Sequence, residues 1–249
     1  MRFTGKAVLV TGGGTGIGRA AAIAFAEEGA SVVVAGPDLE PLRQTVKDIE
    51  SRDGNAGYLL GDLTKESNVE DAVSTTVEQF GSLDIAFNNA GLMVPGPLAD
   101  MERPNWEKAL SVATMTWLSM KHEIAHMRSA GGGVIVNMSS VIGTRTSIPN
   151  TGAYGAAKAA ISSITRTAAL ENIGAGIRIN SLSPGPIATP FSLIRGENET
   201  QQAARMKTAL PIGRVGRVDE VVGTVLWLAS EDSGFAVGTD IVIDGGASA

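Results

Sequence analysis

The residues with the clearest chemical potential are Tyr154 and Lys158, which stand four positions apart. On an α-helix this spacing puts both side chains next to each other on one face. A free tyrosine titrates near pH ~10, which is too high for a base at neutral pH. A neighbouring ammonium stabilises the phenolate and lowers the pKa of the phenol. The pair therefore predicts a tyrosine that exchanges a proton with substrate, although an exposed Tyr–Lys contact without function has the same spacing.

A glycine-rich turn is the second candidate for chemistry. The sequence TGGGTGIG occupies residues 11–18, after an apolar run and before a helical pattern. Glycines let the backbone approach a ligand closely, and the helix N-terminus offers N–H groups to a pyrophosphate. The spacing matches neither G-x-G-x-x-G nor a P-loop, which needs Lys and then Ser or Thr after its last glycine. A strand-to-helix turn without a ligand is the alternative.

The elements that must position these residues alternate along the chain. Strands are expected at 6–10, 31–35, 57–60, 83–88, 134–138, 177–182 and 240–243, and helices at 16–28, 39–51, 67–80, 104–128, 154–172 and 219–229. This order predicts an α/β fold, a Rossmann-like doubly wound parallel sheet of about seven strands with helices on both faces. We expect one domain over residues 1–249, with ligands at the carboxyl ends of the strands.

One long segment shows no strand pattern. Residues 191–216 are polar and are interrupted by Gly196, Pro211 and Gly213. Long irregular segments in compact domains often cover sites. We therefore expect residues 190–216 to form a lid over the substrate, with a poorly ordered surface excursion as the alternative.

Composition excludes several classes of partner and chemistry. The net charge of −6, without a run of like charges, argues against a nucleic-acid or membrane partner. The absence of cysteine excludes disulfides and thiolate chemistry and suits the cytoplasm. The N-terminal segment does not resemble a signal peptide, and no apolar run is long enough to span a bilayer. We expect a cytoplasmic protein that acts on a small molecule.

The pattern H-E-x-x-H at residues 122–126 matches a zinc protease signature. It contains the only two histidines of the chain, so a third histidine ligand is lacking, although a carboxylate could serve. We expect no metal site, and a zinc hydrolase is kept as a rival hypothesis.

Further motifs occur in register along the chain. They are Asp62-Leu63, Asn88-Asn89-Ala90-Gly91, Ser139-Ser140, Tyr154-x-x-x-Lys158, a Pro-Gly-Pro-Ile-Ala-Thr run at 184–189, and Asp244-Gly245-Gly246. With the glycine turn, this series resembles the short-chain dehydrogenase/reductase family over essentially the whole chain.

The resemblance implies hydride transfer between a nicotinamide cofactor and a secondary alcohol or ketone. It implies catalysis by Ser140, Tyr154 and Lys158, and Ser140 is preferred to Ser139 because Val-Ile-Gly follows it. The residues implied in cofactor binding are Gly12, Thr15, Gly16, Ile17, Gly18, Asp38, Asp62, Leu63, Asn89, Ala90, Gly91, Tyr154, Lys158, Pro184, Gly185, Ile187 and Thr189. The substrate options include 3-oxoacyl thioesters and small cyclic or sugar alcohols.

The cofactor preference depends on the residues after the second strand. No base stands at Thr15 or Pro37, where relatives that use NADP often carry one, and Asp38 is close by. A carboxylate usually holds the free ribose diol of NAD, so NAD is favoured. Arg19 and Arg43 keep NADP open.

One family feature is missing from the chain. The family usually places an asparagine, which holds a water near the lysine, where counting gives Val112 or Ala113. Neither side chain hydrogen-bonds to water, so Ser111, Thr114 or a backbone carbonyl must substitute, or proton relay is impaired. A cofactor-binding module with little catalysis is therefore the alternative function. The resemblance also implies a dimer or tetramer with an interface through helices 104–128 and 154–172.

Overall fold

Seven short apolar strands form the centre of the molecule. In the computed structural model they make one parallel sheet, in the order β3-β2-β1-β4-β5-β6-β7. The strands are β1 (Ala7–Thr11), β2 (Ser31–Gly36), β3 (Asn55–Leu60), β4 (Ile85–Asn88), β5 (Gly133–Met138), β6 (Ile177–Pro184) and β7 (Asp240–Ile243). The structure describes residues 1–192 and 196–249.

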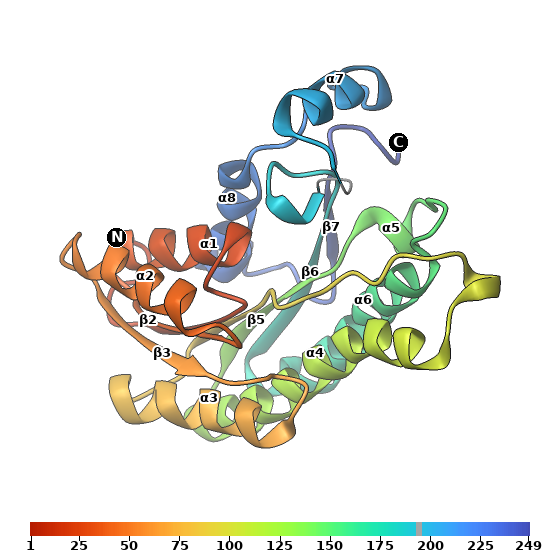
Figure 1. Ribbon diagram of the computed structural model, residues 1–249. Helices are drawn as coiled ribbons and strands as arrows, with labels where there is room; N and C mark the ends of the chain where they lie inside the picture. Colours follow the sequence, from red (N-terminus) through yellow and green to blue (C-terminus); the bar gives the residue numbers. More distant parts are fainter. Residues whose placement is uncertain (193–195) are drawn as a thin grey trace.

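Helices cover both faces of this sheet (Figure 1). Helices α1 (Gly16–Glu27), α2 (Leu39–Glu50) and α8 (Val218–Ala229) lie on one face. Helices α3 (Glu66–Phe80), α4 (Arg103–Ala130) and α6 (Gly152–Asn172) lie on the other. The remaining helical elements are the short α5 (Val141–Thr144), α7 (Glu199–Ala209) and four 3-10 turns, Leu98–Asp100, Ile173–Ala175, Pro190–Ser192 and Glu231–Ser233. The predicted doubly wound parallel sheet is confirmed.

Alternate residues of one strand fill two separate cores. Val8 and Val10 pack with α1 and α8, whereas Leu9 between them packs with α3 and α4. All three side chains are at most 1% exposed. A strand buried on both faces needs apolar residues at every position, which explains why these runs lack polar alternation.

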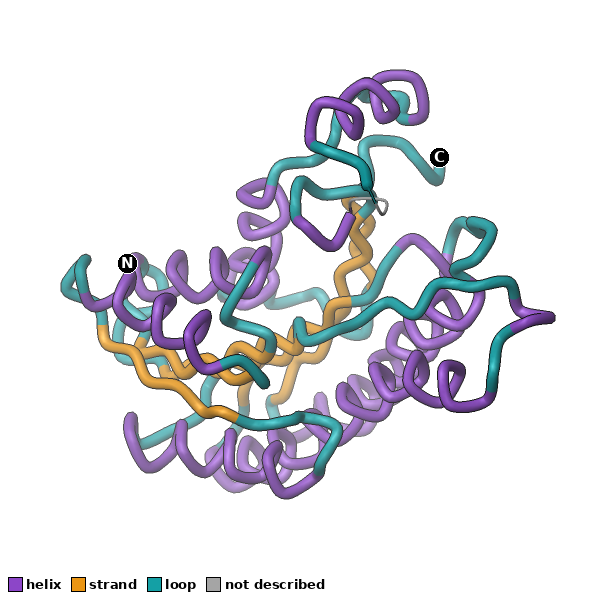
Figure 2. Tube along the Cα trace, viewed as in Figure 1, coloured by secondary structure: helices purple, strands orange, loops and turns teal. Residues whose placement is uncertain are grey.

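The chain reverses its direction of winding at the centre of the sheet. It leaves β1 toward β2 and β3, then returns to place β4 on the other side of β1. At such a point the connections after two neighbouring strands part and leave a crevice at the carboxyl ends. Figure 2 shows the loops that follow β1 and β4 meeting at this edge of the sheet.

The prediction of an irregular segment at 191–216 is wrong in part, because α7 lies within it. A reciprocal cap starts this helix: Gln201 N donates to Asn198 Oδ1 at 2.9 Å, and Asn198 N donates to Gln201 Oε1 at 3.0 Å. Met206 and Leu210 are buried and give it an apolar face. The sequence analysis missed this helix because its few apolar residues stand among many polar ones and show no clear helical period. Residues 193–195, and with them Arg195, lie outside the described residues.

Candidate active site

Tyr154 and Lys158 lie one helical turn apart at the start of α6, and Lys158 reaches the end of β5 at Met138 and the loop after β4 at Gly91. They are 6% and 3% exposed, so the pair is not a surface contact. The Lys158 ammonium nitrogen lies 5.8 Å from the centroid of the Tyr154 ring. A buried phenol next to a buried cation is the arrangement that the sequence predicts for proton exchange.

Burial acts on both groups in the direction that disfavours charge. It raises the pKa of the Tyr154 phenol, and a hydrogen bond with Ser140 opposes the rise. It lowers the pKa of Lys158 to about 8. In the protein alone, therefore, the pKa of Tyr154 is not lowered, and Ser140 is the neighbour that favours its phenolate.

The two adjacent serines after β5 have different surroundings. Ser139 is turned beneath α6, where its Oγ lies 2.9 Å from the Lys158 carbonyl oxygen and 2.7 Å from Ser162 Oγ. Ser140 caps α5, and its Oγ accepts a hydrogen bond from Ile142 N at 3.1 Å. This leaves the Ser140 hydroxyl proton free to be donated toward Tyr154 or a substrate oxygen. The geometry supports Ser140 over Ser139.

The ammonium of Lys158 meets the backbone and apolar atoms. Its Nζ donates to the Met138 carbonyl oxygen at 2.7 Å. Gly91 and Val112 lie beside it: a Cβ on Gly91 would be 3.7 Å from Lys158 Nζ and 4.0 Å from Val112 Cγ1. Val112 is fully buried. Of the two positions that counting along the sequence gave for the missing asparagine, Val112 is the one placed beside Gly91. The polar group that contacts the ammonium is a backbone carbonyl.

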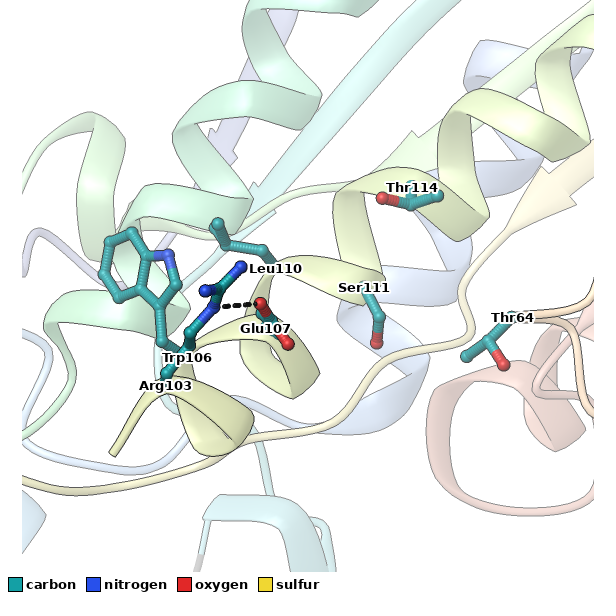
Figure 3. Close-up of a pocket in the computed structure, with 7 residues that line it drawn as sticks. All are labelled: Thr64, Arg103, Trp106, Glu107, Leu110, Ser111 and Thr114. Atoms are coloured by element: carbon teal, nitrogen blue, oxygen red, sulfur yellow. Dashed lines mark hydrogen bonds and ion pairs between the residues drawn. The ribbon is translucent and has the colours of Figure 1, made fainter. Parts of the chain in front are cut away.

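The two hydroxyls expected as substitutes lie elsewhere. Ser111 and Thr114 line a hollow of about 460 Å³ on the outer face of α4, together with Thr64, Arg103, Trp106, Glu107 and Leu110 (Figure 3). The Ser111 hydroxyl donates to the Lys108 carbonyl at 2.7 Å. Lys158 does not line this hollow. This hollow is therefore separate from the Tyr154 site.

The glycine turn is held against the loop after β4. Thr11 Oγ1 accepts hydrogen bonds from Asn89 N at 3.1 Å and Ala90 N at 3.2 Å. Asn89 Nδ2 lies 3.3 Å from the carbonyl oxygens of both Thr11 and Gly12. A Cβ on Gly12, which has φ of +65°, would come within 2.9 Å of Ala90 Cα. Thr11 was missed as a site residue, although it opens the glycine motif.

The residues at this crevice fit a dinucleotide. Helix α1 begins at Gly16 after the exposed Thr15, so the N–H groups of Gly16, Ile17 and Gly18 have no carbonyl partner within the helix. They form a place for a pyrophosphate. Across the crevice, a Cβ on Gly16 would lie 3.6 Å from Thr189 Cγ2. Gly18 is buried against Gly12 and Asn89 and serves close packing.

A family model described as enoyl-(acyl carrier protein) reductase matches residues 12–248. Cyclohexanol dehydrogenase of an Acinetobacter species is 36% identical, over 98% of this chain and 95% of its own. The 2,5-dichloro-2,5-cyclohexadiene-1,4-diol dehydrogenase of Sphingobium indicum is 34% identical, over 98% and 97%. The crystal structure of levodione reductase superposes with a TM-score of 0.94 at 33% identity, covering 99% of each chain.

The chain belongs to the short-chain dehydrogenase/reductase family. As a member, it is an oxidoreductase of alcohols and ketones that uses a nicotinamide cofactor. The comparisons thereby favour an oxidoreductase over a cofactor-binding module with little catalysis.

Three further positions that the resemblance assigns to cofactor binding, Asp38, Asp62 and Leu63, lie in different surroundings. Asp38 is exposed at the N-terminus of α2. Asp62 is turned to Thr64, whose N and Oγ1 donate to it at 3.0 and 2.7 Å, and these bonds lower its pKa. The Leu63 side chain is buried in the core between the sheet and α3. Only the Leu63 backbone is therefore open to a ligand.

The segment after β6 is fastened at both ends. Gly185 N donates to the Ile243 carbonyl at 2.9 Å, directly after Pro184 ends the strand. The buried Ile187 pairs with Gly216 in a short parallel bridge, which brings Thr189 over the glycine turn. The glycine turn, the loop after β4 and the segment around Thr189 thus border one crevice.

An aromatic residue of the 190–216 segment reaches the site and was not foreseen as important. The Phe191 and Tyr154 ring centroids are 6.0 Å apart, with 49° between the ring planes. Phe191 is 49% exposed. In the same region of the structure, Arg205 pairs with Glu197 at 2.7 Å, and Arg145 is exposed. The surface beside Tyr154 is therefore apolar on the Phe191 side.

The H-E-x-x-H motif does not form a ligand set. His122 Nε2 lies 3.1 Å from Glu66 Oε1. His126 Nε2 accepts a hydrogen bond from Leu83 N at 3.2 Å, so its lone pair is engaged. Glu123 points the opposite way and is fully buried. Within residues 1–192 and 196–249, no group of three potential metal-ligating side chains comes together.

Proposed function

We propose that this protein is an NAD(H)-dependent dehydrogenase that interconverts alicyclic secondary alcohols and their ketones. Tyr154 is the general acid and base, Ser140 orients the substrate oxygen, and Lys158 supports the phenolate. The observation that carries the proposal is the buried Tyr154–Lys158 pair, which is bordered by Ser140 on one side and by Phe191 on the other.

The proton steps follow from the positions of the three side chains. In oxidation, the Tyr154 phenolate takes the hydroxyl proton of the substrate; in reduction, the phenol returns a proton to the carbonyl oxygen. The Ser140 hydroxyl donates a hydrogen bond to the charge that develops on that oxygen. Lys158, anchored by the Met138 carbonyl, holds a positive charge near the ring. The cofactor, when bound, supplies or accepts the hydride.

The preference for NAD rests on the charges near the expected adenosine end. Arg19 is paired with Asp48, and Arg43 lies 3.5 Å from Glu40. Both arginines that kept NADP open are thus engaged with the protein. The exposed carboxylate of Asp38 suits the free ribose hydroxyls of NAD. Turnover with NADH and NADPH at equal concentration tests this, and a strong preference for NADPH would contradict it.

The substrate class rests on the apolar side of the site and on the relatives. Two of the relatives are named for six-membered carbocyclic alcohols. Phe191 gives this chain a flat apolar surface next to Tyr154, which suits such a ring. The loop 92–100 closes another side, because Leu98 lies against Gly152 and Gly96 N donates to the Asn150 carbonyl at 2.9 Å.

The segment 190–216 is proposed to act as the substrate lid. Gln202 on α7 donates to Ser192 Oγ at 2.8 Å and to the Ser192 carbonyl at 3.1 Å, so α7 is tied to the turn that carries Phe191. In Figure 1, α7 stands beyond the end of β6, away from the helical layers. A lid in this place would close over the ring of the substrate while the cofactor crevice keeps its shape.

The assembly and location are proposals as well. Trp117 on α4 and Leu170 on α6 are 51% and 76% exposed, and they support a homo-oligomer through these helices. Analytical ultracentrifugation of the protein and of Trp117→Glu tests this. We also propose a cytoplasmic location, which suits a chain without cysteine. Among the helices of the described residues, none has the length and apolarity to cross a bilayer.

The decisive assay follows the absorbance of NADH with a panel of alcohols and ketones. We expect the highest kcat/KM with cyclohexanol-type rings, lower values with open-chain secondary alcohols, and the lowest with 3-oxoacyl thioesters. A thioester substrate that exceeds every ring compound would overturn the proposed class, while leaving the proposed roles of Tyr154 and Lys158 in place.

A further inference from the structure

Glu123 is a carboxyl group for which the reaction has no evident use. It is the central acid of the H-E-x-x-H motif, but its side chain points away from both histidines and into the core beneath the sheet. It is fully buried. Its hydrogen-bond partner is Asn88, the last residue of β4, whose Nδ2 donates to Glu123 Oε2 at 2.9 Å.

The bond to Glu123 belongs to a chain of buried polar groups. Asn88 Nδ2 also donates to Asn137 Oδ1 at 3.0 Å. Asn137 Nδ2 in turn lies 2.9 Å from Thr165 Oγ1 and 3.2 Å from Met120 Sδ. The amide protons of both asparagines are thereby used. The chain links α4, β4, β5 and α6 through side chains that are all at most 3% exposed.

Two acceptors remain without a partner in this cluster. Among the described residues, the buried side-chain atoms that lack a hydrogen bond are Asn88 Oδ1 and Glu123 Oε1. They belong to the two residues that are already joined through their other atoms. An amide and a carboxylic acid form a closed pair when the amide N–H meets one acid oxygen and the acid O–H meets the amide oxygen. One proton on Glu123 would therefore serve both atoms.

We propose that Glu123 is a neutral carboxylic acid in the working protein, and that its paired hydrogen bonds with Asn88 position the ends of β4 and β5 beneath the active site. Asn88 and Asn137 stand opposite each other in the sheet. Asn89, which follows Asn88, bonds to Thr11 and Gly12 of the glycine turn. Met138, which follows Asn137, carries the carbonyl oxygen that binds Lys158. Glu123 is thus a positioning residue, and only its link to catalysis rests on the proposed function.

The surroundings give a charge on Glu123 no support. Burial raises its pKa to about 8, and the Asn88 hydrogen bond opposes the rise only in part. Three titratable groups on the neighbouring helices are engaged elsewhere: Lys158 with Met138, His126 with Leu83, and His122 with Glu66 on α3. A buried carboxylate with one donor and no cation is costly, so the proton is retained.

The sign of the pH effect follows from this raised pKa. The folded protein keeps the proton up to about pH 8, whereas the unfolded chain releases it near its ordinary value of 4.5. Between these values the folded state binds more protons, so this group's contribution to stability is full below the lower value and is lost as pH rises to the upper one. Glutamine keeps the shape of the acid and does not titrate.

The experiment measures Tm for the protein and Glu123→Gln between about pH 5 and pH 9. We expect Tm of the variant, relative to the parent, to rise through this range and to level off above about pH 8. Exposed Glu78→Gln is the matched control, and its difference from the parent should stay flat. In infrared spectra at neutral pH, the carbonyl band of a buried carboxylic acid should be present in the parent and absent from Glu123→Gln.

Kinetics test the positioning role separately. At neutral pH, Glu123→Gln should keep kcat and the KM for the cofactor within about twofold, whereas Glu123→Leu, which leaves Asn88 with an unpaired donor, should raise that KM about tenfold. A pH-independent Tm difference together with no acid band would overturn the neutral carboxylic acid. Equal losses in Gln and Leu would overturn the paired arrangement. The Tm measurements and the infrared band test the protonation of Glu123 even if the proposed substrate class is wrong.

Discussion

The two sides of the site are built in different ways. The expected cofactor side is made of strand ends and tight turns, where the side chains of Thr11 and Asn89 bond to backbone groups of the neighbouring turn. The proposed substrate side is made of Phe191 and α7, and Gln202 of α7 bonds to Ser192 next to Phe191. On the first side, buried bonds hold two turns together, whereas on the second a half-exposed ring is itself the contact surface. Substitutions on the first side should therefore change stability and cofactor binding, and those on the second should change substrate turnover.

The largest expected effect falls on the group that both sides share. Tyr154→Phe removes the hydroxyl that carries the proton and keeps the ring that packs against Phe191. We expect kcat to fall about 10²–10⁴-fold, because general acid–base catalysis supplies that much. Cofactor affinity, measured by the fluorescence of bound NADH, should change little. A variant that retains most of its turnover would remove Tyr154 from the proton step.

The next effect tests the rigid side. Thr11→Val keeps the shape of the side chain but deprives the N–H groups of Asn89 and Ala90 of their acceptor. Thr11 is 3% exposed, so the loss should destabilise the protein by about 1–3 kcal/mol in urea unfolding. The cofactor should also bind more weakly. Thr11→Ser keeps the oxygen and is the control. Similar losses in Val and Ser would assign the effect to packing rather than to hydrogen bonding.

A substitution at Phe191 should change substrate turnover and leave stability and cofactor binding nearly unchanged. Phe191→Ala removes a contact between rings that contributes about 0.5–1.5 kcal/mol, and its half-exposed position contributes little to folding. We expect kcat/KM for ring ketones to fall about tenfold, with the cofactor KM and Tm nearly unchanged. Phe235→Ala, a fully exposed phenylalanine distant from α6's N-terminal turn in sequence, is the control. An equal loss with small open-chain ketones would show that Phe191 does not select the ring.

The same contrast explains what could be predicted from the sequence. The order of strands and helices follows from local apolar runs, and this order places the glycine turn at the end of β1 and Tyr154 and Lys158 in the helix that follows β5. Helix α7 was missed, because its apolar face consists of a few residues such as Met206 and Leu210. Thr11 lies in the glycine motif, but its role, like those of Phe191 and Glu123, depends on contacts between segments far apart in the chain. No local pattern encodes such contacts.

The smallest effect concerns the apolar wall beside Lys158. Counting along the sequence gives Val112 or Ala113 for the missing asparagine, and Val112 is the fully buried one that lies next to Gly91, which in turn borders the ammonium. Val112→Asn would place a polar group there and oppose the burial that lowers the pKa of Lys158 to about 8. A higher pKa keeps the ammonium charged at higher pH. The alkaline fall of kcat should therefore move upward by less than about one unit.

Val112 belongs to the core between the sheet and helices α3, α4 and α6, so its substitution tests neither Phe191 nor the glycine turn. Val112→Thr is the control, since it keeps the branched shape and adds one hydroxyl. We expect it to move the alkaline limb less than asparagine does, with the KM for ring ketones unchanged in both variants. If the limb stays in place while kcat rises, the asparagine acts by opening a route for the proton and not by changing the charge on Lys158.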